Sequence, residues 1–357
     1  MSESADTATG TPELLDHLVT SRQPSLVAGA PGTGKSTLLV EVAVQRLRAG
    51  LDPLSLLVLA PTRNTAAMLR NELSARAEQT FTEPVVRTWS AYAFDLIRRA
   101  RLQGLLPMVE RAPRLLSGPE QDTLLGHLLE GHEQGLTPSP PWPEELRLAV
   151  GTRGFRKEVR EFFDRVSELG LEPDDIAQLG EQAERGEWVA AAMFYQEYRD
   201  LLDLGSAEAF DPAGLITRAA ELLEANPEFL AAEQDQLQLV LVDDLQEASL
   251  SQHRLLTLLG RGRNLVAFAA PDNVVQGFRG ARADELAQFT QRYSTPRNPA
   301  GIYELKTSYR MGPAIAQAWK RVVRRVPVAA GLHGRTLEFG EDPHPATVQT
   351  HLFENST

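Results

Sequence analysis

The sequence has 357 residues, 42% of them apolar and 24% charged, which is the composition of a globular protein long enough for two or three compact units. It contains no cysteine, which excludes disulfides and thiolate metal sites, and it has neither a signal-peptide pattern at its start nor an apolar run of roughly 20 residues, so we expect a cytoplasmic protein with no membrane partner. The net charge of −12 disfavours nucleic acid as a ligand on average, although the charge is unevenly distributed.

Short apolar strands alternate with helices in the first hundred residues. After a helix at 12–20, strands are predicted at 25–28, 56–60 and 85–88, and helices at 35–49, 64–78 and 90–101. Such alternation indicates a parallel sheet with crossover helices.

The pattern becomes purely helical from about residue 105 to residue 204. A helix at 212–224 follows, and then strands return at 237–242, 265–269 and 302–305, with a helix at 311–323 and a further strand at 348–353. We therefore expect an α/β protein whose sheet is interrupted by an all-helical insertion.

Two stretches are rich in arginine. The segment 310–335 has six basic residues and no acid, and the segment 147–165 has six basic residues diluted by Glu158, Glu161 and Asp164. Each is either a solvated helix face or a surface for an anionic partner.

A glycine-rich loop separates the first strand from the helix that follows it. Its sequence fits G-x-x-x-x-G-K-S, and the alternative of a chance glycine-rich turn is disfavoured by the strand before it and the helix after it. In such a loop the main-chain amides surround a phosphate, the lysine reaches the β- and γ-phosphates, and the serine ligates Mg²⁺. We therefore predict Mg-ATP binding at Gly29, Ala30, Pro31, Gly32, Thr33, Gly34, Lys35, Ser36 and the following Thr37.

The strand at 237–242 ends in two carboxylates. Asp243 is expected to hold Mg²⁺, and Asp244 is expected to act as general base for the attacking water. The alternative is a polar strand end that enters a loop, but the phosphate loop upstream favours the metal-binding interpretation.

Six sequence blocks, in order, resemble the UvrD/Rep-type superfamily 1 DNA helicases. They are the phosphate loop, residues 60–67, 88–94, 242–247 and 277–281, and Ser308-Tyr309-Arg310. The amino-acid sequence of the phosphate loop and that of Leu51-Asp52-Pro53 more narrowly resemble the AdnA-type subunit of actinobacterial helicase–nucleases.

The resemblance implies roles for individual residues. Gln246 would sense the γ-phosphate, Tyr309 would stack on adenine, and Arg310 would be an arginine finger. It also implies contacts with single-stranded DNA or a duplex end at Thr62, Arg63, Trp89, Phe278 and Arg279. Phe278 could equally be a core residue, and Arg279 could equally form a surface ion pair.

The resemblance further implies a RecA-like domain 1A in two parts, 1–104 and 206–297, a 1B-like helical insertion at 105–205, and a truncated start of domain 2A at 298–357. The implied activity is a DNA-dependent ATPase and 3′→5′ helicase that is incomplete alone, because the later motifs are missing. The alternative is an ATP-binding, non-motor subunit that docks onto a partner helicase or helicase–nuclease.

Several positions depart from the family pattern. Asp244 stands where glutamate is usual, and Glu247 where aspartate is usual. Asn273 is too short to replace a glutamine that senses the γ-phosphate, and Gln276 stands where an aromatic residue usually contacts DNA. The shorter Asp244 would set the base back by one methylene, and a displacement of about 1 Å can cost on the order of 100-fold in rate.

Overall fold

The computed structural model describes residues 11–78, 81, 84–107, 111–204, 207–210, 212–277, 280–326 and 335–339. These residues form two compact units. The first unit comprises the described residues of 1–88, 231–248 and 259–357, and the second comprises those of 89–230 and 249–258. The strand predicted at 348–353 and the residues Phe278 and Arg279 lie outside the described residues.

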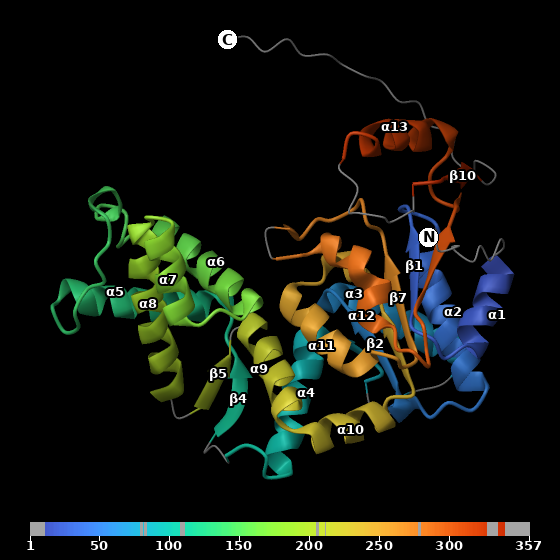
Figure 1. Cartoon of the computed structure of the whole chain (residues 1–357), viewed down its shortest axis with the longest axis horizontal. Helices are drawn as coiled ribbons and strands as arrows, with labels where there is room; N and C mark the ends of the chain where they lie inside the picture. The colour runs from blue at the N-terminus through green and yellow to red at the C-terminus, as the bar shows by residue number, and fades with distance from the viewer. Residues whose placement is uncertain are drawn as a thin grey trace, which may run out of the picture. The chain divides into compact units, whose positions relative to one another are not determined.

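The first unit is built on a six-stranded sheet in the order β3-β2-β6-β7-β1-β8. Figure 1 labels β1, β2 and β7 of this sheet. All neighbouring strands are parallel, with Ser25 of β1 level with Val266 of β7 and with Gly301 of β8. The strands are β1 (Ser25–Gly29), β2 (Leu56–Ala60), β3 (Val86–Thr88), β6 (Leu239–Val242), β7 (Leu265–Ala269) and β8 (Gly301–Leu305). This arrangement confirms the predicted α/β class.

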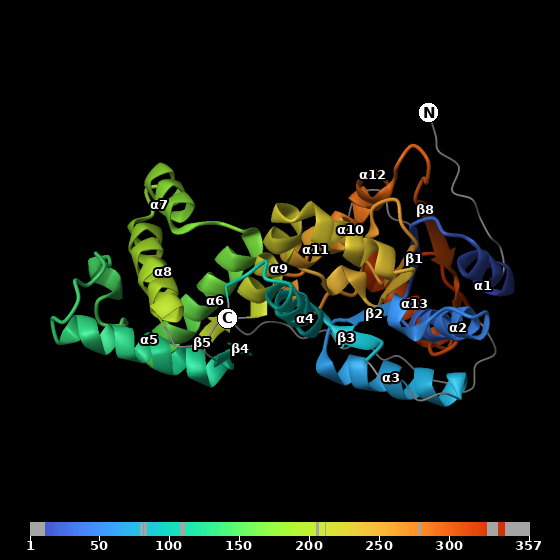
Figure 2. The ribbon, with the colours of Figure 1, turned by 90° about the horizontal axis from the view of Figure 1, so that it is seen from below.

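Helices cover the sheet of the first unit. Figure 2 shows α2 and α3 on one side of the strands and α12 on the other. The helices of this unit are α1 (Thr11–Thr20), α2 (Lys35–Arg48), α3 (Arg63–Ala77), α12 (Phe289–Tyr293) and α13 (Pro313–Val323), and α10 (Pro227–Gln236) and α11 (Leu250–Gly260) run from one unit into the other.

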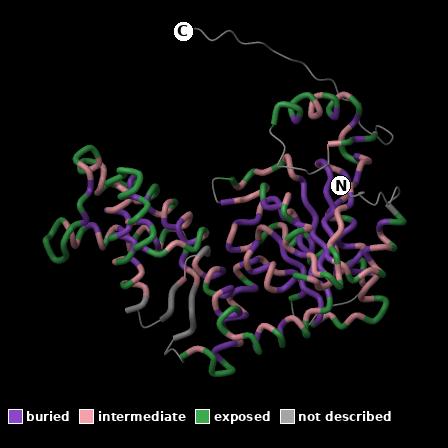
Figure 3. Tube along the Cα trace, viewed as in Figure 1, coloured by how far each residue is buried: buried purple, intermediate pink, exposed green. Residues whose placement is uncertain are grey.

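The core of the first unit forms where the apolar faces of α1, α2 and α3 pack on the sheet. Leu38 and Val42 of α2 and Leu69 of α3 lie in one cluster with Val58 and Leu241 from the centre of the sheet. The central strands β1, β2, β6 and β7 are buried along their whole length (Figure 3), as expected for parallel strands with both faces covered. A rigid sheet with buried strands fixes the loops at the strand ends, where the candidate site lies.

β8 corrects one expectation from the sequence. We expected the strand at 302–305 to open a second domain, but it pairs with β1 as the edge strand of the first sheet. After β8, the short strand β9 (Thr307–Ser308) pairs in parallel with β10 (Glu338–Phe339). Residues 301–308 therefore extend the first unit, and where a second domain begins stays a prediction.

The second unit is mainly helical. Trp142, Phe155, Phe163 and Phe194 pack in its core, and the rings of Trp142 and Phe155 meet edge to face with centroids 5.0 Å apart. Its helices are α4 (Trp89–Leu102), α5 (Gly118–Glu133), α6 (Arg153–Leu169), α7 (Pro173–Gln182), α8 (Gly186–Leu204) and α9 (Pro212–Ala225).

The second unit is not all-helical, contrary to the expectation for its insertion. β4 (Arg111–Leu115) and β5 (Ala207–Phe210) form a two-stranded parallel sheet. Pro113 cannot continue a helix and cannot donate to a strand ladder, and the register of the pair shifts between Arg111 and Arg114 around it. Within the described residues of the chain, no helix combines the length and the apolarity needed to cross a bilayer.

Candidate nucleotide-binding site

The phosphate loop connects β1 to α2, as predicted. Gly32 and Gly34 have φ angles of +81° and +84°, a left-handed conformation that favours glycine. A Cβ atom on Gly32 would lie 2.7 Å from the Cβ of Arg310, so the space also requires glycine. Gly34 caps α2 without a side-chain hydrogen bond, which leaves the first amides of the helix available to an anion.

The Lys35 side chain is buried against this loop. Its Nζ donates to the carbonyl oxygens of Gly29 and Ala30, both at 2.9 Å. Burial lowers the pKa of Lys35 to about 8, and the carboxylates of Asp244 and Asp243 oppose that shift. A buried cation that donates to main-chain carbonyls beside the amino end of a helix is a fitting partner for a phosphate.

Ser36 and Asp243 meet although 207 residues separate them in the sequence. The Ser36 hydroxyl donates to Asp243, with its Oγ 3.1 Å from Oδ1 and 3.3 Å from Oδ2. The meeting follows from the strand order, because β1 and β6 are separated by a single strand and both end at the same edge of the sheet. The structure thus brings together the two residues that the sequence assigned to Mg²⁺.

The electrostatics of Asp243 fit a cation. Burial, together with the charge of Asp244, raises the pKa of Asp243 to about 6 against the opposing effects of the Ser36 hydroxyl and Lys35. A buried carboxylate beside a second carboxylate and a hydroxyl is an oxygen donor set of the kind that Mg²⁺ prefers, with waters and substrate phosphates completing its shell. The residues present therefore fit a magnesium ion.

Asp244 and Gln246 lie at the turn after β6. Asp244 has a left-handed backbone, with φ 48° and ψ 51°, and its Oδ1 accepts a hydrogen bond from Gln246 Nε2 at 3.0 Å. The Gln246 side chain is buried, and its Oε1 accepts from the amide of Ala270 at 2.8 Å. Gln246 therefore links the proposed base to the carboxyl end of β7.

Glu247 has a role that the sequence did not reveal. Its two carboxylate oxygens accept the main-chain amides of Val275 and Gln276, each at 2.8 Å. The glutamate at a position where aspartate is usual was the available signal, but main-chain partners 28 and 29 residues away cannot be deduced from it. Glu247 fixes the segment that leads to Phe278 and Arg279.

The chain after β8 passes along the phosphate loop. The amide of Tyr309 donates to the carbonyl of Gly32 at 2.9 Å, and the Tyr309 side chain is 61% exposed. Arg310 is exposed, and its charge contributes to lowering the pKa of Lys35. Both residues that the resemblance assigned to the nucleotide therefore lie beside the loop.

The residues predicted to contact DNA differ in their exposure to solvent. Thr62 caps α3 by accepting the amide of Thr65 at 3.1 Å, and Arg63 is exposed at the start of that helix. Trp89 begins α4 and is 3% exposed, so its indole serves the core and is not presented to a base as the structure stands. DNA contact at these positions stays a prediction.

Some arginines of the two basic stretches form ion pairs within the protein. Arg335 forms a bidentate ion pair with Asp272, and Arg156 forms one with Asp122. Arg321, Arg324 and Arg325, at the end of α13, are exposed. Together with Arg310, these three are the exposed arginines among the described residues of the 310–335 stretch.

The fold and the site together define a P-loop nucleotide-binding domain of the RecA-like class. The family model of the UvrD/REP helicase N-terminal domain matches residues 11–294, and this chain belongs to that family.

Relatives with assigned names support the same family. ATP-dependent DNA helicase PcrA of Staphylococcus epidermidis is 23% identical over 308 residues, which is 85% of this chain and 38% of the relative. PcrA of Leuconostoc citreum is 23% identical over 315 residues, 86% of this chain and 38% of the relative. An ATP-dependent helicase/nuclease subunit of Lactococcus lactis is 27% identical over 161 residues, 45% of this chain and 13% of the relative. The chain thus spans less than two fifths of the length of these relatives.

Proposed function

We propose that this chain is the ATP-binding half of a superfamily 1 DNA helicase that couples ATP hydrolysis to 3′→5′ movement on single-stranded DNA. The observation that carries the proposal is the convergence of Lys35, Ser36 and Asp243 at one end of the sheet. The names of the PcrA relatives, which are ATP-dependent DNA helicases, support the DNA-directed activity.

In this proposal the main-chain amides of the phosphate loop, to which Pro31 contributes no N–H, and the Lys35 ammonium group hold the β- and γ-phosphates, and Tyr309 offers its exposed ring to adenine. Ser36 and Asp243 would hold Mg²⁺, which would supply charge neutralisation at the phosphates. Asp244 receives a proton from the attacking water, Gln246 positions Asp244, and Arg310 stabilises the charge on the γ-phosphate.

The coupling to DNA would pass through the turn after β6. Gln246 and Glu247 connect this turn to the end of β7 and to the segment before Phe278 and Arg279. Phe278 would stack on bases and Arg279 would contact phosphates, which binds single strands without regard to sequence.

Nucleotide binding tests the first part of the proposal. A fluorescent ATP analogue should bind in the presence of Mg²⁺, and Lys35→Ala should weaken binding at least 100-fold because a buried charge-assisted phosphate contact is lost. Lys157→Ala, on an exposed face of α6, is the matched control and should leave binding unchanged. Equal affinity of the Lys35→Ala variant and the parent would refute the site.

DNA-stimulated turnover tests the second part. The chain should be assayed together with the second motor region that its resemblance to superfamily 1 helicases implies, because such motors hydrolyse ATP between two domains that close on it. Single-stranded DNA should raise the ATPase rate at least tenfold. An unchanged rate with DNA, alongside intact nucleotide binding, would overturn the helicase assignment while leaving the ATP site in place.

A second function is favoured by the short base Asp244 and by Asn273, which is exposed and replaces a longer glutamine. In that case the chain binds ATP with negligible turnover and docks onto a partner helicase or helicase–nuclease subunit. The name of the Lactococcus lactis relative, a helicase/nuclease subunit, supports this alternative. Turnover of several per second by the chain itself would rule it out.

A further inference from the structure

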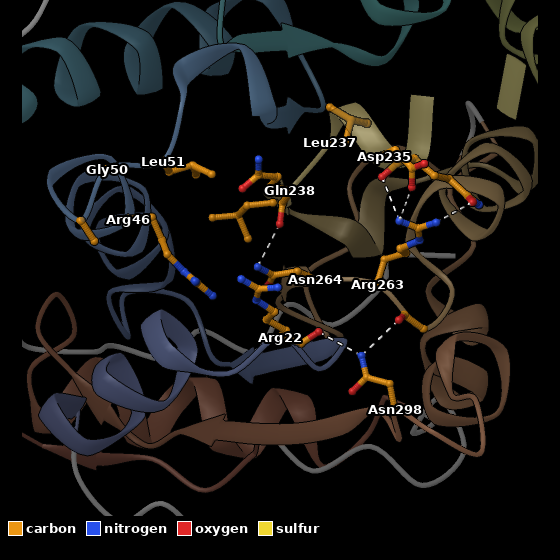
Figure 4. A pocket seen from close by; sticks show the side chains of 14 residues that line it. Arg22, Arg46, Gly50, Leu51, Asp235, Leu237, Gln238, Arg263, Asn264 and Asn298 are labelled. Atoms are coloured by element: carbon orange, nitrogen blue, oxygen red, sulfur yellow. Dashed lines mark hydrogen bonds and ion pairs between the residues drawn. The ribbon is translucent and has the colours of Figure 1, made fainter. Parts of the chain in front are cut away.

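A second concave pocket lies in the first unit, at the edge of the sheet opposite to the phosphate loop. It has a volume of about 520 Å³, within the range of small-molecule sites. Its walls come from five segments: the loop before β1, the end of α2, the segment that enters β6, the loop before β7 and Asn298 before β8 (Figure 4). The phosphate loop follows the carboxyl end of β1, whereas this pocket is at the amino ends of β1, β6 and β7, so the two sites are distinct.

Two arginines give the pocket a positive charge. Figure 4 shows Arg46, from the last turn of α2, extending toward Arg22 and Asn264. Burial and then the charge of Arg22 lower the pKa of Arg46, which agrees with this proximity. Among the residues that the structure describes, neither arginine has a carboxylate within 4.0 Å, whereas the third arginine of the pocket, Arg263, is 3.2 Å from Asp235.

Two buried polar atoms of the pocket have no hydrogen-bond partner within the described chain. They are the donor Arg46 Nε and the acceptor Asn264 Oδ1. Both side chains are held by their other groups, since Arg46 Nη2 donates to Ser21 O at 2.7 Å and Asn264 Nδ2 donates to Gln238 O at 3.0 Å. An unsatisfied buried polar group is destabilising. Both atoms are buried while the pocket is empty, so a ligand that offers an anionic oxygen and a hydrogen-bond donor would satisfy them once the Arg46 and Asn264 side chains turn toward the cavity.

We propose that this pocket binds a small organic phosphate, with the phosphate between Arg22 and Arg46 and a hydroxyl or amine of the ligand donating to Asn264 Oδ1. A phosphate monoester carries a charge of about −1.5 to −2 at neutral pH, which matches two unpaired guanidinium groups. Its three terminal oxygens can accept from both groups, whereas one arginine already satisfies the two oxygens of a carboxylate. Leu51 and Leu237 line the space left for the body of the ligand.

Ribose 5-phosphate is a suitable probe, and Lys35→Ala is the background in which to test it. That substitution disables the phosphate loop, so the result is independent of the proposed helicase function. Titration calorimetry should detect binding of ribose 5-phosphate, no binding of ribose, and at least tenfold weaker binding of succinate. The ribose arm tests the need for the phosphate, and the succinate arm tests a carboxylate in its place.

Variants of the two arginines locate the site. Arg22→Gln and Arg46→Gln should each weaken ribose 5-phosphate binding at least tenfold, and Arg46→Lys should weaken it less. Arg48→Gln is the matched control in the same turn of α2, because Arg48 is exposed and donates to the carbonyl of Arg76 instead. Its affinity should be unchanged.

Three results would overturn the inference. They are the absence of binding up to about 10 mM probe, affinity that is insensitive to both arginine substitutions, and succinate binding as tightly as ribose 5-phosphate. Arg46 could instead serve only the carbonyl end of α2, and Arg46→Gln would then lower stability without any ligand effect. Arg22 is exposed in a loop, so Arg22→Gln decides the question even if Arg46→Gln fails to fold.

Discussion

At the scale of single residues, Asp244 combines an unusual backbone with a short side chain. Its left-handed φ of 48° is tolerated better by aspartate than by most residues, and its carboxylate is held by Gln246. Lengthening the side chain by one methylene would bring the carboxylate closer to the position of an attacking water. We expect Asp244→Glu to raise DNA-stimulated ATP turnover about tenfold in the presence of the second motor region. Steady-state kinetics, with Asp244→Asn as the inactive control, check this, and reduced turnover in the Glu variant would contradict it.

Asp243 links the chemistry of the site to stability. Its pKa is raised from 3.8 to about 6, so the folded protein binds a proton more tightly than the unfolded chain between these values. The free energy of unfolding therefore falls as pH rises through that window, and the full cost is present above pH 6. At about 1.4 kcal/mol per pKa unit the cost is at most about 3 kcal/mol.

Asp243→Asn should therefore stabilise the metal-free protein by about 1–2 kcal/mol at pH 7.5. The gain should be about 1 kcal/mol smaller at pH 5, where Asp243 is largely protonated in the folded state. Hydrogen exchange of the β1 and β6 amides, in urea and with EDTA to keep the protein metal-free, measures this change in the free energy of unfolding. The same substitution should abolish Mg²⁺-dependent nucleotide binding. A loss of stability at pH 7.5 would show that the Ser36 hydrogen bond outweighs the burial cost.

At the scale of elements, Glu247 connects the turn after β6 to residues 275–276 by two charge-assisted hydrogen bonds. Removing them should loosen the segment before Phe278. We expect Glu247→Ala to speed hydrogen exchange of the Val275 and Gln276 amides at least tenfold, which corresponds to about 1.4 kcal/mol. Glu247→Gln, which keeps one acceptor, should fall between the parent and Glu247→Ala. Exchange rates equal to those of the parent in both variants would show that other contacts fix this segment.

The predicted elements succeeded where local patterns are strong. The bounds of β2 and β7 agree with the prediction. The first residues of α2 and α9 also agree, because glycine and proline mark these helix starts, and their last residues differ from the prediction by one. β4 was missed since five residues with a central proline do not resemble a strand. β8 was assigned to the wrong sheet because a sequence does not say which sheet edge a strand joins.

The site was predictable to a similar degree. The phosphate loop and the strand ending in Asp243 have recognisable sequence patterns, and the Ser36–Asp243 contact followed from them. The burial of Trp89 and the main-chain partners of Glu247 could not be predicted from the sequence, because both depend on tertiary packing. The arginine pocket was invisible for the same reason, since its walls come from five separate segments of the first unit.

At the scale of the whole molecule, the two units have separate cores. The nucleotide site lies within the first unit, whereas Trp142 is buried in the core of the second. We expect Mg-ATP to raise the melting temperature of the first unit by several degrees, because a ligand stabilises the state that binds it. Hydrogen exchange of β1 should report this shift, and hydrogen exchange of α6 and α8 in the second unit should change less. Equal shifts for both probes would show that the units unfold as one.

The pairing of β4 with β5 has a consequence for the evolution and engineering of this fold. Arg111 lies level with Ala207 and Leu115 with Phe210, and the amide of Leu116 donates to the carbonyl of Phe210 at 2.8 Å. Because the two strands are parallel, the chain leaves the pair at Leu115 and re-enters it at Ala207, at the opposite end of the neighbouring strand. A short direct link cannot join these two points, so the intervening residues have to form a crossover. Any segment that replaces them, in evolution or by design, must therefore run back along the pair before it enters β5.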